Sequence, residues 1–333
     1  MSRFFSKKGF QKIAGILACA LALGAFSSSA HATEFPSKLV TLYVGGPAGG
    51  AMDVLTRALA RSLSTVWKTT VIVENRPGAA SLLGAMHVAK SKPDGYSIGL
   101  ASTAIFIGKA LNGSSIGFDP VTDVVPVSMI VDVPFALFVH PSVPAKSLNE
   151  LIAYAKANPG KLQYGTGGSG STGHIYGSVL QQLTGTKVSE VHYRSAMEAL
   201  QATAAGEVQF GFADTNSIAP QARKGAVVTL AVASNKRSGW LPDVPTMAEA
   251  GLPNFIEPTW LGIFTTAGVP RDILLKLNRD VNLAAQSEEM APFVKAFGDV
   301  RATESLDELQ ALMKQESVKW TDVVVKTGIE GQR

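Results

Sequence analysis

Residues 39–66 read LVTLYVGGPAGGAMDVLTRALARSLSTV and place a strand, a glycine-rich loop and a helix in succession. The apolar run from Leu39 to Val44 is typical of a buried strand, whereas the apolar positions from Asp53 to Val66 recur at helical spacing. Gly45 to Gly50 joins the two. A strand that passes through a tight loop into a helix is the first part of a parallel βα unit, so this segment predicts an α/β fold.

The same alternation of short apolar runs with helical patterns continues along the chain, as expected of repeated βα units. Strands are predicted over residues 39–44, 70–74, 96–101, 126–131, 135–139, 162–164, 188–193, 210–213 and 228–233. Helices are predicted over residues 53–66, 81–90, 147–158, 172–184, 196–205 and 218–224. From Pro270 to Thr327 the pattern is mostly helical, with a break near Gly298 and a new helix cap around Ser305.

Composition and charge restrict the class of protein. The chain of 333 residues is 46% hydrophobic and only 17% charged, which is too apolar for a disordered protein and long enough for two domains. Its formal net charge of +4 arises from the first twelve residues, which hold Arg3, Lys7, Lys8 and Lys12 and no acid. Without these four, basic and acidic residues are equal in number. A neutral body does not attract nucleic acid or an anionic membrane, so neither is expected as a partner.

The N-terminal stretch is typical of an exported protein. Its basic residues are followed by an apolar run from Ile13 to Phe26 and by small residues that end in Ala30-His31-Ala32. The pattern predicts a cleavable secretory signal peptide over residues 1–32, a mature start at Thr33 and a periplasmic location. A membrane anchor is the alternative, but the apolar run is shorter than the roughly 20 residues that span a bilayer.

Cys19 is the single cysteine and lies inside the predicted signal peptide. The preceding Ile16-Leu17-Ala18 faintly resembles a lipidation motif, which leaves lipidation of Cys19 as an open alternative. After cleavage behind Ala32 the mature chain has no cysteine. Disulfides, cysteine catalysis and cysteine metal sites are therefore excluded, and stability must come from the buried core.

A second glycine-rich loop, from Gly165 to His174, also follows a predicted strand and opens a helix. The first backbone N–H groups of a helix have no partner within the helix and lie at the positive end of its dipole, so such a junction can hold a carboxylate or phosphate. Each loop alone is equally well explained as a tight turn capped by Asp53 or Ser171. Two such loops in the two halves of the chain favour a cleft with an anion site on each wall.

Two other kinds of site find weak support. Gly165, Gly167 and Gly170 match the dinucleotide fingerprint, with Glu190 twenty residues beyond, but the preceding strand is short and an exported protein meets little nicotinamide cofactor. The sequence has no metal-binding motif and no phosphate-loop lysine, so no cofactor and no metal are expected. Residue types for a hydrolase triad occur without the glycine-flanked serine of a nucleophile elbow, at Ser169, Ser171, His174, His192 and Asp214.

From Phe35 onward the chain resembles the Bug family of periplasmic solute receptors, which serve tripartite tricarboxylate transporters. The resemblance covers nearly the whole predicted mature chain, with its motifs in order. They are Pro47-Ala48-Gly49-Gly50-x-x-Asp53, Val73-Glu74-Asn75-Arg76-Pro77-Gly78-Ala79, Pro93-Asp94-Gly95-Tyr96, Phe118-Asp119-Pro120-Val121-x-Asp123, residues 141–147, residues 158–162, residues 241–251 and Trp260-x-Gly262-x-Phe264.

The resemblance implies a type II periplasmic-binding-protein fold, in which two βα domains enclose a ligand cleft and the chain crosses between them twice. Domain 1 would combine residues 33–134 with residues 259–333, and domain 2 would cover residues 135–258. The family binds small organic acids through loop amides and hydroxyls. Carried over by position, the ligand contacts would be Pro47, Ala48, Gly49, Gly50, Asp53, Ser102, Thr103, Gly168, Ser169, Ser171, Thr172, His174 and Asp214.

Four positions bear on the shape of this site. Gly45 and Gly46 stand where the family commonly has proline and phenylalanine, so a wider pocket is expected beside the first loop. His192 departs from the family pattern and adds an imidazole that either contacts the ligand or faces solvent. Arg57 follows Asp53 by four residues, so an intrahelical ion pair is expected in place of a ligand anchor.

The resulting hypothesis is a monomeric, non-catalytic receptor. It would close around a small organic carboxylate and deliver it to the membrane permease subunits of a tripartite tricarboxylate-type transporter. Two alternatives stay open: an exported hydrolase using Ser171, His174 and Asp214, and a receptor that feeds a sensor in place of a permease. The sequence does not name the carboxylate.

Overall fold

The computed structural model describes residues 35–78, 81–255, 259–301 and 304–329. The predicted signal peptide, with Cys19, lies outside these residues. From Lys38 onward the described chain forms one compact unit. None of its described helices is both long and apolar enough to span a membrane.

The first sheet has six strands in the order β11-β4-β10-β3-β1-β2. β1 (Val40–Val44) pairs in parallel with β2 (Val71–Asn75) and with β3 (Ser97–Ser102). β10 (Thr259–Thr266) lies antiparallel between β3 and β4 (Val124–Val133), and the short β11 (Asp299–Val300) extends the sheet beyond β4. We call this sheet and its helices lobe 1.

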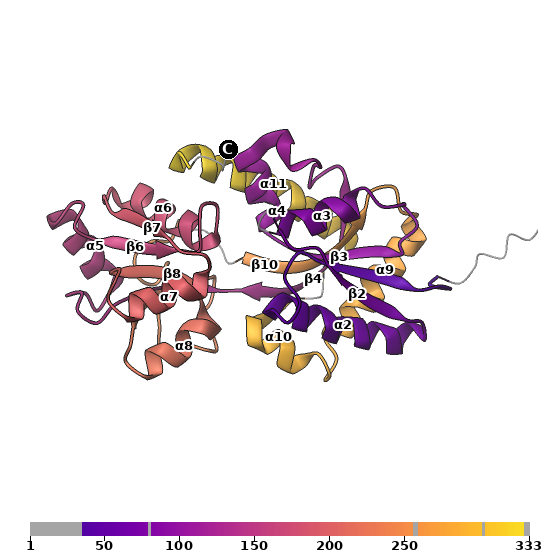
Figure 1. The fold of residues 1–333 in the computed structure, drawn as a ribbon, viewed down its shortest axis with the longest axis horizontal. Helices are drawn as coiled ribbons and strands as arrows, with labels where there is room; N and C mark the ends of the chain where they lie inside the picture. Colours follow the sequence, from indigo (N-terminus) through magenta and orange to yellow (C-terminus); the bar gives the residue numbers. More distant parts are fainter. Residues whose placement is uncertain (1–34, 79–80, 256–258, 302–303, 330–333) are drawn as a thin grey trace, which may run out of the picture. The chain divides into compact units, whose positions relative to one another are not determined.

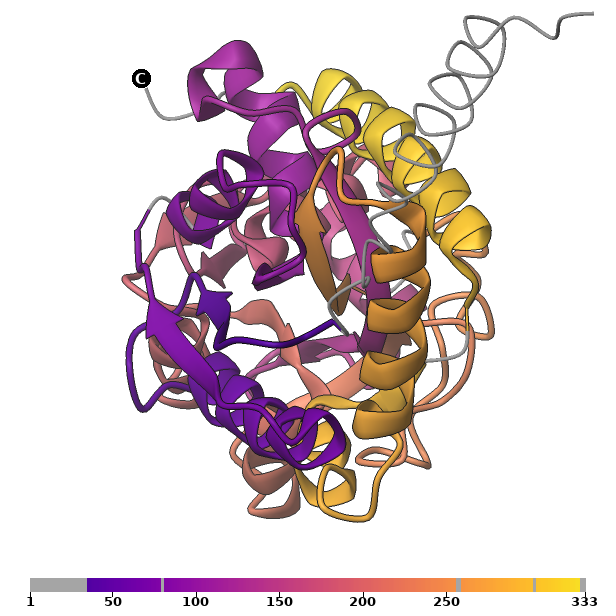
Figure 2. The same ribbon diagram turned by 90° about the vertical axis from the view of Figure 1, so that its right-hand side faces the viewer.

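The helices of lobe 1 come from both ends of the described chain. Figure 2 shows α9, in orange, and α11, in yellow, beside β4, against which both pack. The α-helices are α2 (Ala51–Trp67), α3 (Leu82–Ala89), α4 (Ala104–Asn112), α9 (Arg271–Ala285), α10 (Ala291–Phe297) and α11 (Leu306–Thr327), and a 3-10 turn, η2, covers Gly113–Ile116.

The second sheet has five strands in the order β7-β6-β8-β5-β9 (Figure 1). The strands are β5 (Phe135–Val139), β6 (Gln163–Thr166), β7 (Ser189–His192), β8 (Phe210–Asp214) and β9 (Val228–Ala233). β6 is parallel to β7 and β8, whereas β5 is antiparallel to β8 and β9. With α5 (Leu148–Ala157), α6 (Thr172–Thr184), α7 (Ala196–Ala204) and α8 (Thr215–Arg223), this sheet forms lobe 2.

The predicted α/β class is confirmed, and each sheet combines parallel strand pairs with antiparallel ones. β10 was not predicted as a strand. All eight of its residues are buried, so it lacks the polar and apolar alternation that identifies a half-exposed strand. The helix α4 was also missed, because its apolar start, Ala104 to Ile107, continues the apolar pattern of β3.

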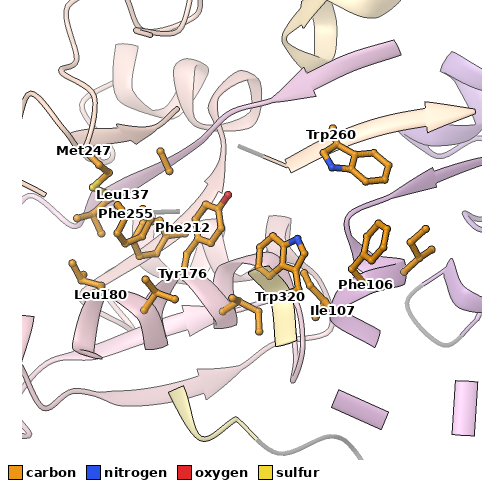
Figure 3. Packing of buried hydrophobic residues seen from close by; sticks show 14 of the residues in the cluster. Phe106, Ile107, Leu137, Tyr176, Leu180, Phe212, Met247, Phe255, Trp260 and Trp320 are labelled. Carbon is orange, nitrogen blue, oxygen red and sulfur yellow. The ribbon is translucent and has the colours of Figure 1, made fainter. Parts of the chain in front are cut away.

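One hydrophobic core joins the two lobes. It contains Phe106 and Trp260 of lobe 1 and Tyr176 and Phe212 of lobe 2. In Figure 3, Trp320 of α11 lies between Tyr176 and Phe106, and α11 packs against both α4 and α6. The C-terminal helix therefore contributes to the burial of side chains from both lobes.

Candidate functional site

A cavity of about 250 Å³ lies where the carboxyl ends of strands from both sheets meet helix N-termini. Four of the residues expected to contact a ligand line it, namely Ser102, Thr103, Thr172 and Asp214. The remaining lining residues are Ala51, Met52, Val133, Phe135, Asn216, Ser217, Thr259, Trp260, Leu261 and Phe297.

The polar part of this cavity is built from the first residues of four helices. Ala51 and Met52 begin α2, Thr103 precedes α4, Thr172 begins α6, and Asp214 precedes α8. Each helix N-terminus carries roughly half a positive charge. Lysine, arginine and histidine are absent from the described lining residues. An anion in the cavity would thus be held by backbone amides and hydroxyl groups.

Asp214 is the one charged side chain on the described lining. Its carboxylate accepts a hydrogen bond from the Ser217 amide at 2.9 Å and so caps α8. The N-terminus of α8 is thereby partly neutralised, whereas Gly50 at the start of α2 provides no side-chain cap. The first turn of α2 also holds a carboxylate, Asp53, so an acid lies at the start of both helices.

Asp53 stabilises the first glycine-rich loop without lining the cavity. It is 2% exposed, and one of its carboxylate oxygens accepts hydrogen bonds from the Gly49 amide at 2.8 Å and from Arg57 Nε at 2.9 Å. The other oxygen accepts from Asn75 Nδ2 at 2.9 Å. The Arg57 hydrogen bond, with the contributions of Gly49 and Asn75, keeps the pKa of Asp53 below its usual range despite burial. The predicted pair of Asp53 with Arg57 is confirmed.

The first loop itself differs from the expectation of a wider pocket. A Cβ atom on Gly45 would lie 2.4 Å from the Cβ of Ser81, so the space that a side chain would fill is taken by the residue before α3. Gly45 thus permits a close approach of two segments, and the expectation of added pocket space is wrong at this position. Pro47, Ala48, Gly49 and Gly50 precede α2 without lining the 250 Å³ cavity.

The second loop is closed by its own side chains. Ser171 caps α6 by accepting from the His174 amide, as predicted, and His174 Nδ1 accepts from the Gly170 amide at 2.9 Å. His174 Nε2 lies 3.0 Å from Glu190.

His192 is engaged at both ring nitrogens, by Thr166 and by Glu190. Neither histidine lines the 250 Å³ cavity. Gly168 lies in the loop and donates its amide to Thr166, and Ser169 lines a separate, largely apolar cavity of about 460 Å³.

These contacts do not assemble a hydrolytic triad. Ser171 and Asp214 each serve as a helix cap, and the His174 ring nitrogens face Gly170 and Glu190. The described residues also hold no group of three or more histidine, cysteine, aspartate or glutamate side chains suited to a metal ion.

Aromatic walls of the cavity were missed by reasoning from the sequence. Trp260 comes from β10 and Phe297 from the end of α10. Glu316 of α11, 3% exposed, accepts hydrogen bonds from the indole N–H of Trp260 at 3.0 Å and of Trp320 at 2.9 Å. The carboxylate therefore fixes the orientation of a cavity-lining ring. The sequence feature that could have indicated this contact is the spacing of four residues between Glu316 and Trp320, which places both on one face of a helix.

The chain is similar to receptors of one transporter family. Residues 55–329 match the model of the tripartite tricarboxylate transporter family receptor. The chain is 31% identical to protein BugT of Bordetella pertussis over 319 residues, which cover 95% of this chain and 98% of BugT.

Solved structures show the same fold. The structure of the periplasmic binding protein BugD is similar with a TM-score of 0.75 and 30% identity, over 90% of this chain and all of BugD. R. palustris Rpa4515 with adipate matches with a TM-score of 0.76 and 30% identity, over 89% of this chain and 99% of that protein. The type II periplasmic-binding-protein fold is thereby confirmed. With a family model that spans most of its length and a cavity built from helix N-termini, this chain belongs to the receptor family of the tripartite tricarboxylate transporters.

Proposed function

We propose that this protein captures a small organic carboxylate in the 250 Å³ cavity and delivers it, in the periplasm, to the permease subunits of a tripartite tricarboxylate-type transporter. Its domains would be residues 33–134 with 259–333 and residues 135–258. The observation that carries the proposal is the convergence of four helix N-termini on a cavity whose described lining has no cationic side chain.

The polar groups suit a carboxylate better than a phosphate. Ser102, Thr103 and Thr172, which each carry a hydroxyl group, line the same cavity as the start of α2. A monovalent carboxylate needs few charged partners, because amide and hydroxyl donors at a helix N-terminus can satisfy its two oxygens. A doubly charged phosphate would face Asp214 without a compensating lysine or arginine on the described lining.

The rest of the cavity suits an apolar chain. Phe135, Leu261 and Phe297 lie on its lining. A molecule with a carboxylate at one end and methylene groups beyond it would bury both kinds of surface. The adipate named with the structural neighbour Rpa4515 combines methylene groups with a carboxylate at each end, which makes short aliphatic mono- and dicarboxylates the first class to test.

The test is a thermal-shift and calorimetric screen of the chain from Thr33, after unfolding and refolding to remove any ligand acquired during expression. The panel pairs mono- and dicarboxylates with their methyl esters. At about 100 times its dissociation constant a ligand stabilises by roughly 2.7 kcal/mol. We expect an acid to raise the melting temperature while its ester does not. The absence of a shift with every acid, or hydrolysis of the esters, would contradict the proposal.

A pair of variants locates the site. Thr103, 1% exposed, lines the cavity, and Thr103→Val removes its hydroxyl with little change of shape. We expect about ten- to a hundredfold weaker binding, since a lost hydrogen bond to a charged group is worth about 1.5–3 kcal/mol. Thr65→Val, on the outer face of α2, is the matched control and should bind normally. Delivery is tested by uptake into membrane vesicles that hold the permease subunits; uptake without the receptor would refute it.

A further inference from the structure

One carboxylate stands behind the second glycine loop and contacts three ring-bearing side chains. Glu190 accepts a hydrogen bond from the Tyr164 hydroxyl at 2.9 Å and lies 3.0 Å from His174 Nε2 and 3.4 Å from His192 Nε2. We call Tyr164, His174, Glu190 and His192 the Glu190 cluster. The pairing of β6 with β7 sets it up, because Tyr164 is opposite Glu190 and Thr166 is opposite His192.

The first connection from Glu190 to the loop passes through His174. The Gly170 amide donates to His174 Nδ1 at 2.9 Å, so Nδ1 must be unprotonated. The ring proton of neutral His174 is therefore on Nε2, where it is donated to Glu190. Gly170 has a φ of +75°, a conformation that favours glycine, and it directly precedes Ser171, the cap of α6.

The second connection passes through His192 and Thr166. The Gly168 amide donates to Thr166 Oγ1 at 3.2 Å, and this hydroxyl lies 2.7 Å from His192 Nδ1. Since the hydroxyl oxygen already accepts the amide, its proton is free to be donated to Nδ1. His192 is then protonated on Nε2, which faces Glu190. Both histidines thus connect one carboxylate to an amide of the loop.

We propose that Glu190 is a positioning residue for the ligand site, which orders the Gly168 and Gly170 amides through His174 and His192, and that protonation of His174 releases the loop and weakens ligand binding. The effect on ligand binding rests on the proposed function. Thr172, two residues beyond Gly170, lines the cavity, so a change of the loop moves a wall of the site.

The two connections differ in their response to acid. The Thr166 hydroxyl can rotate and accept a hydrogen bond from His192 Nδ1, but the Gly170 amide can only donate. Protonated His174 would place two N–H groups against each other. Metal binding at His174 Nε2 is disfavoured for the same reason, because a metal-bound ring carries its proton on Nδ1.

The environment of His174 favours its neutral form. Burial, the largest cause, and His192 lower its pKa, while Glu190 acts in the opposite direction, and the net result is a pKa below the usual 6.5. The titratable groups that face it are Glu190 and His192 on β7, with Tyr164 on β6 bonded to Glu190. A folded-state pKa below that of the unfolded chain means that stabilisation is full above about pH 6.5 and is lost as the pH falls through the lowered value.

The first test needs no ligand. Hydrogen exchange of the loop amides is measured by mass spectrometry on the chain from Thr33 between pH 7.5 and 4, after correction for intrinsic exchange rates. In the wild type we expect residues 168–172 to lose protection reversibly on acidification. Glu190→Gln should lose this protection already at pH 7.5. The two histidines face different carboxylate oxygens of Glu190, and a carboxamide has only one oxygen that can accept. Unchanged protection in Glu190→Gln, together with no pH effect in the wild type, would overturn the proposal.

A matched pair of His174 variants separates positioning from a merely structural role. His174→Asn keeps an acceptor near the position of Nδ1 and does not titrate, so loop protection should become independent of pH. His174→Ala should lack protection at every pH. His140→Asn, at a half-buried histidine outside the cluster, should retain the wild-type profile. A wild-type pH profile in His174→Asn would show that another group controls the loop.

The second test measures affinity, with adipate as the probe. We expect its dissociation constant to rise about tenfold in the wild type between pH 7.5 and 5, and to rise less in His174→Asn, which experiences the same ionisation of the probe. If adipate does not bind at any pH while hydrogen exchange changes as expected, adipate is not the ligand. The role of Glu190 in positioning the loop would still be supported by the exchange results. Equal rises in both proteins would overturn the proposed link to binding.

Discussion

Asp53 shows how one side chain can hold a binding loop without lining the cavity. Its hydrogen bonds tie the loop amide of Gly49, the helix residue Arg57 and the strand residue Asn75 together. Asn75 Nδ2 also donates to the Gly46 carbonyl at 3.0 Å. The acid in this motif therefore closes the loop on the end of the sheet, and the loop amides are displayed as a consequence.

Asp53→Asn should lower the free energy of unfolding by about 1–3 kcal/mol, because its amide nitrogen replaces an acceptor for buried donors. Urea denaturation at pH 7 measures the change. Asp272→Asn is the matched control, an exposed acid in the first turn of α9, and should stay within about 0.5 kcal/mol.

The dependence of the free energy of unfolding on pH, measured in the acid range, tests the role of the Asp53 charge independently. The pKa of Asp53 is lowered in the folded protein, so its stabilisation is present above its ordinary value of 3.8 and is lost as the pH falls further. The difference between wild type and Asp53→Asn should therefore shrink below pH 3.8. A constant difference down to pH 2 would refute the assigned role of the charge.

At the scale of the element, α11 combines a locally encoded start with a tertiary role. Ser305 and Glu308 form the capping box, which confirms the predicted cap. Two turns further, Glu316 binds the indole groups of Trp260 and Trp320, and Lys319 forms an ion pair with it. The helix start could thus be predicted from neighbouring residues, whereas the role of Glu316 depends on a strand 56 residues away.

Glu316→Ala should destabilise the protein by about 3–5 kcal/mol, since it leaves two buried indole N–H groups and a lysine without their acceptor. The loss should appear in urea unfolding followed by tryptophan fluorescence. Asp322→Ala, on the same helix, removes an exposed pair with Lys326 and should cost less than about 0.5 kcal/mol. Equal effects of the two variants would contradict the role of Glu316.

For the molecule as a whole, α10 connects the lobes beside the cavity. The Trp240 indole of lobe 2 donates to the carbonyl of Lys295 at 2.9 Å, and the Asn216 side chain donates to the carbonyl of Ala296. Phe297, the next residue, lines the cavity. A ligand that contacts both lobes would favour the conformations in which these bonds form.

Trp240→Phe removes the indole donor and keeps an aromatic ring. Because the lost bond is worth about 0.5–1.5 kcal/mol, the dissociation constant for a ligand identified by the screen should rise about two- to tenfold. Lys295→Ala is the control, since the bond involves its backbone carbonyl. Calorimetry measures both affinities. Normal affinity in Trp240→Phe would show that this contact does not contribute to binding.

Features that depend on neighbouring residues could be predicted from the amino-acid sequence. The hydrophobic periodicity predicted most of the strands and helices. The structure confirms the ion pair of Asp53 with Arg57, and it confirms the helix caps at Ser171 and Ser305. The two glycine loops could be recognised as strand-to-helix junctions. The ligand contacts assigned to them remain a prediction, and four of the expected residues line the cavity.

Contacts between groups far apart in the chain could be recognised only in the folded structure. The register of β6 and β7 brings Glu190 to Tyr164, and the antiparallel β10 brings Trp260 to Glu316. The sheet order and the place of α10 decide that Phe297 lines the cavity. Local patterns arise from backbone geometry within a few residues, whereas these contacts arise from strand pairing and from burial of surface shared by segments far apart in the chain.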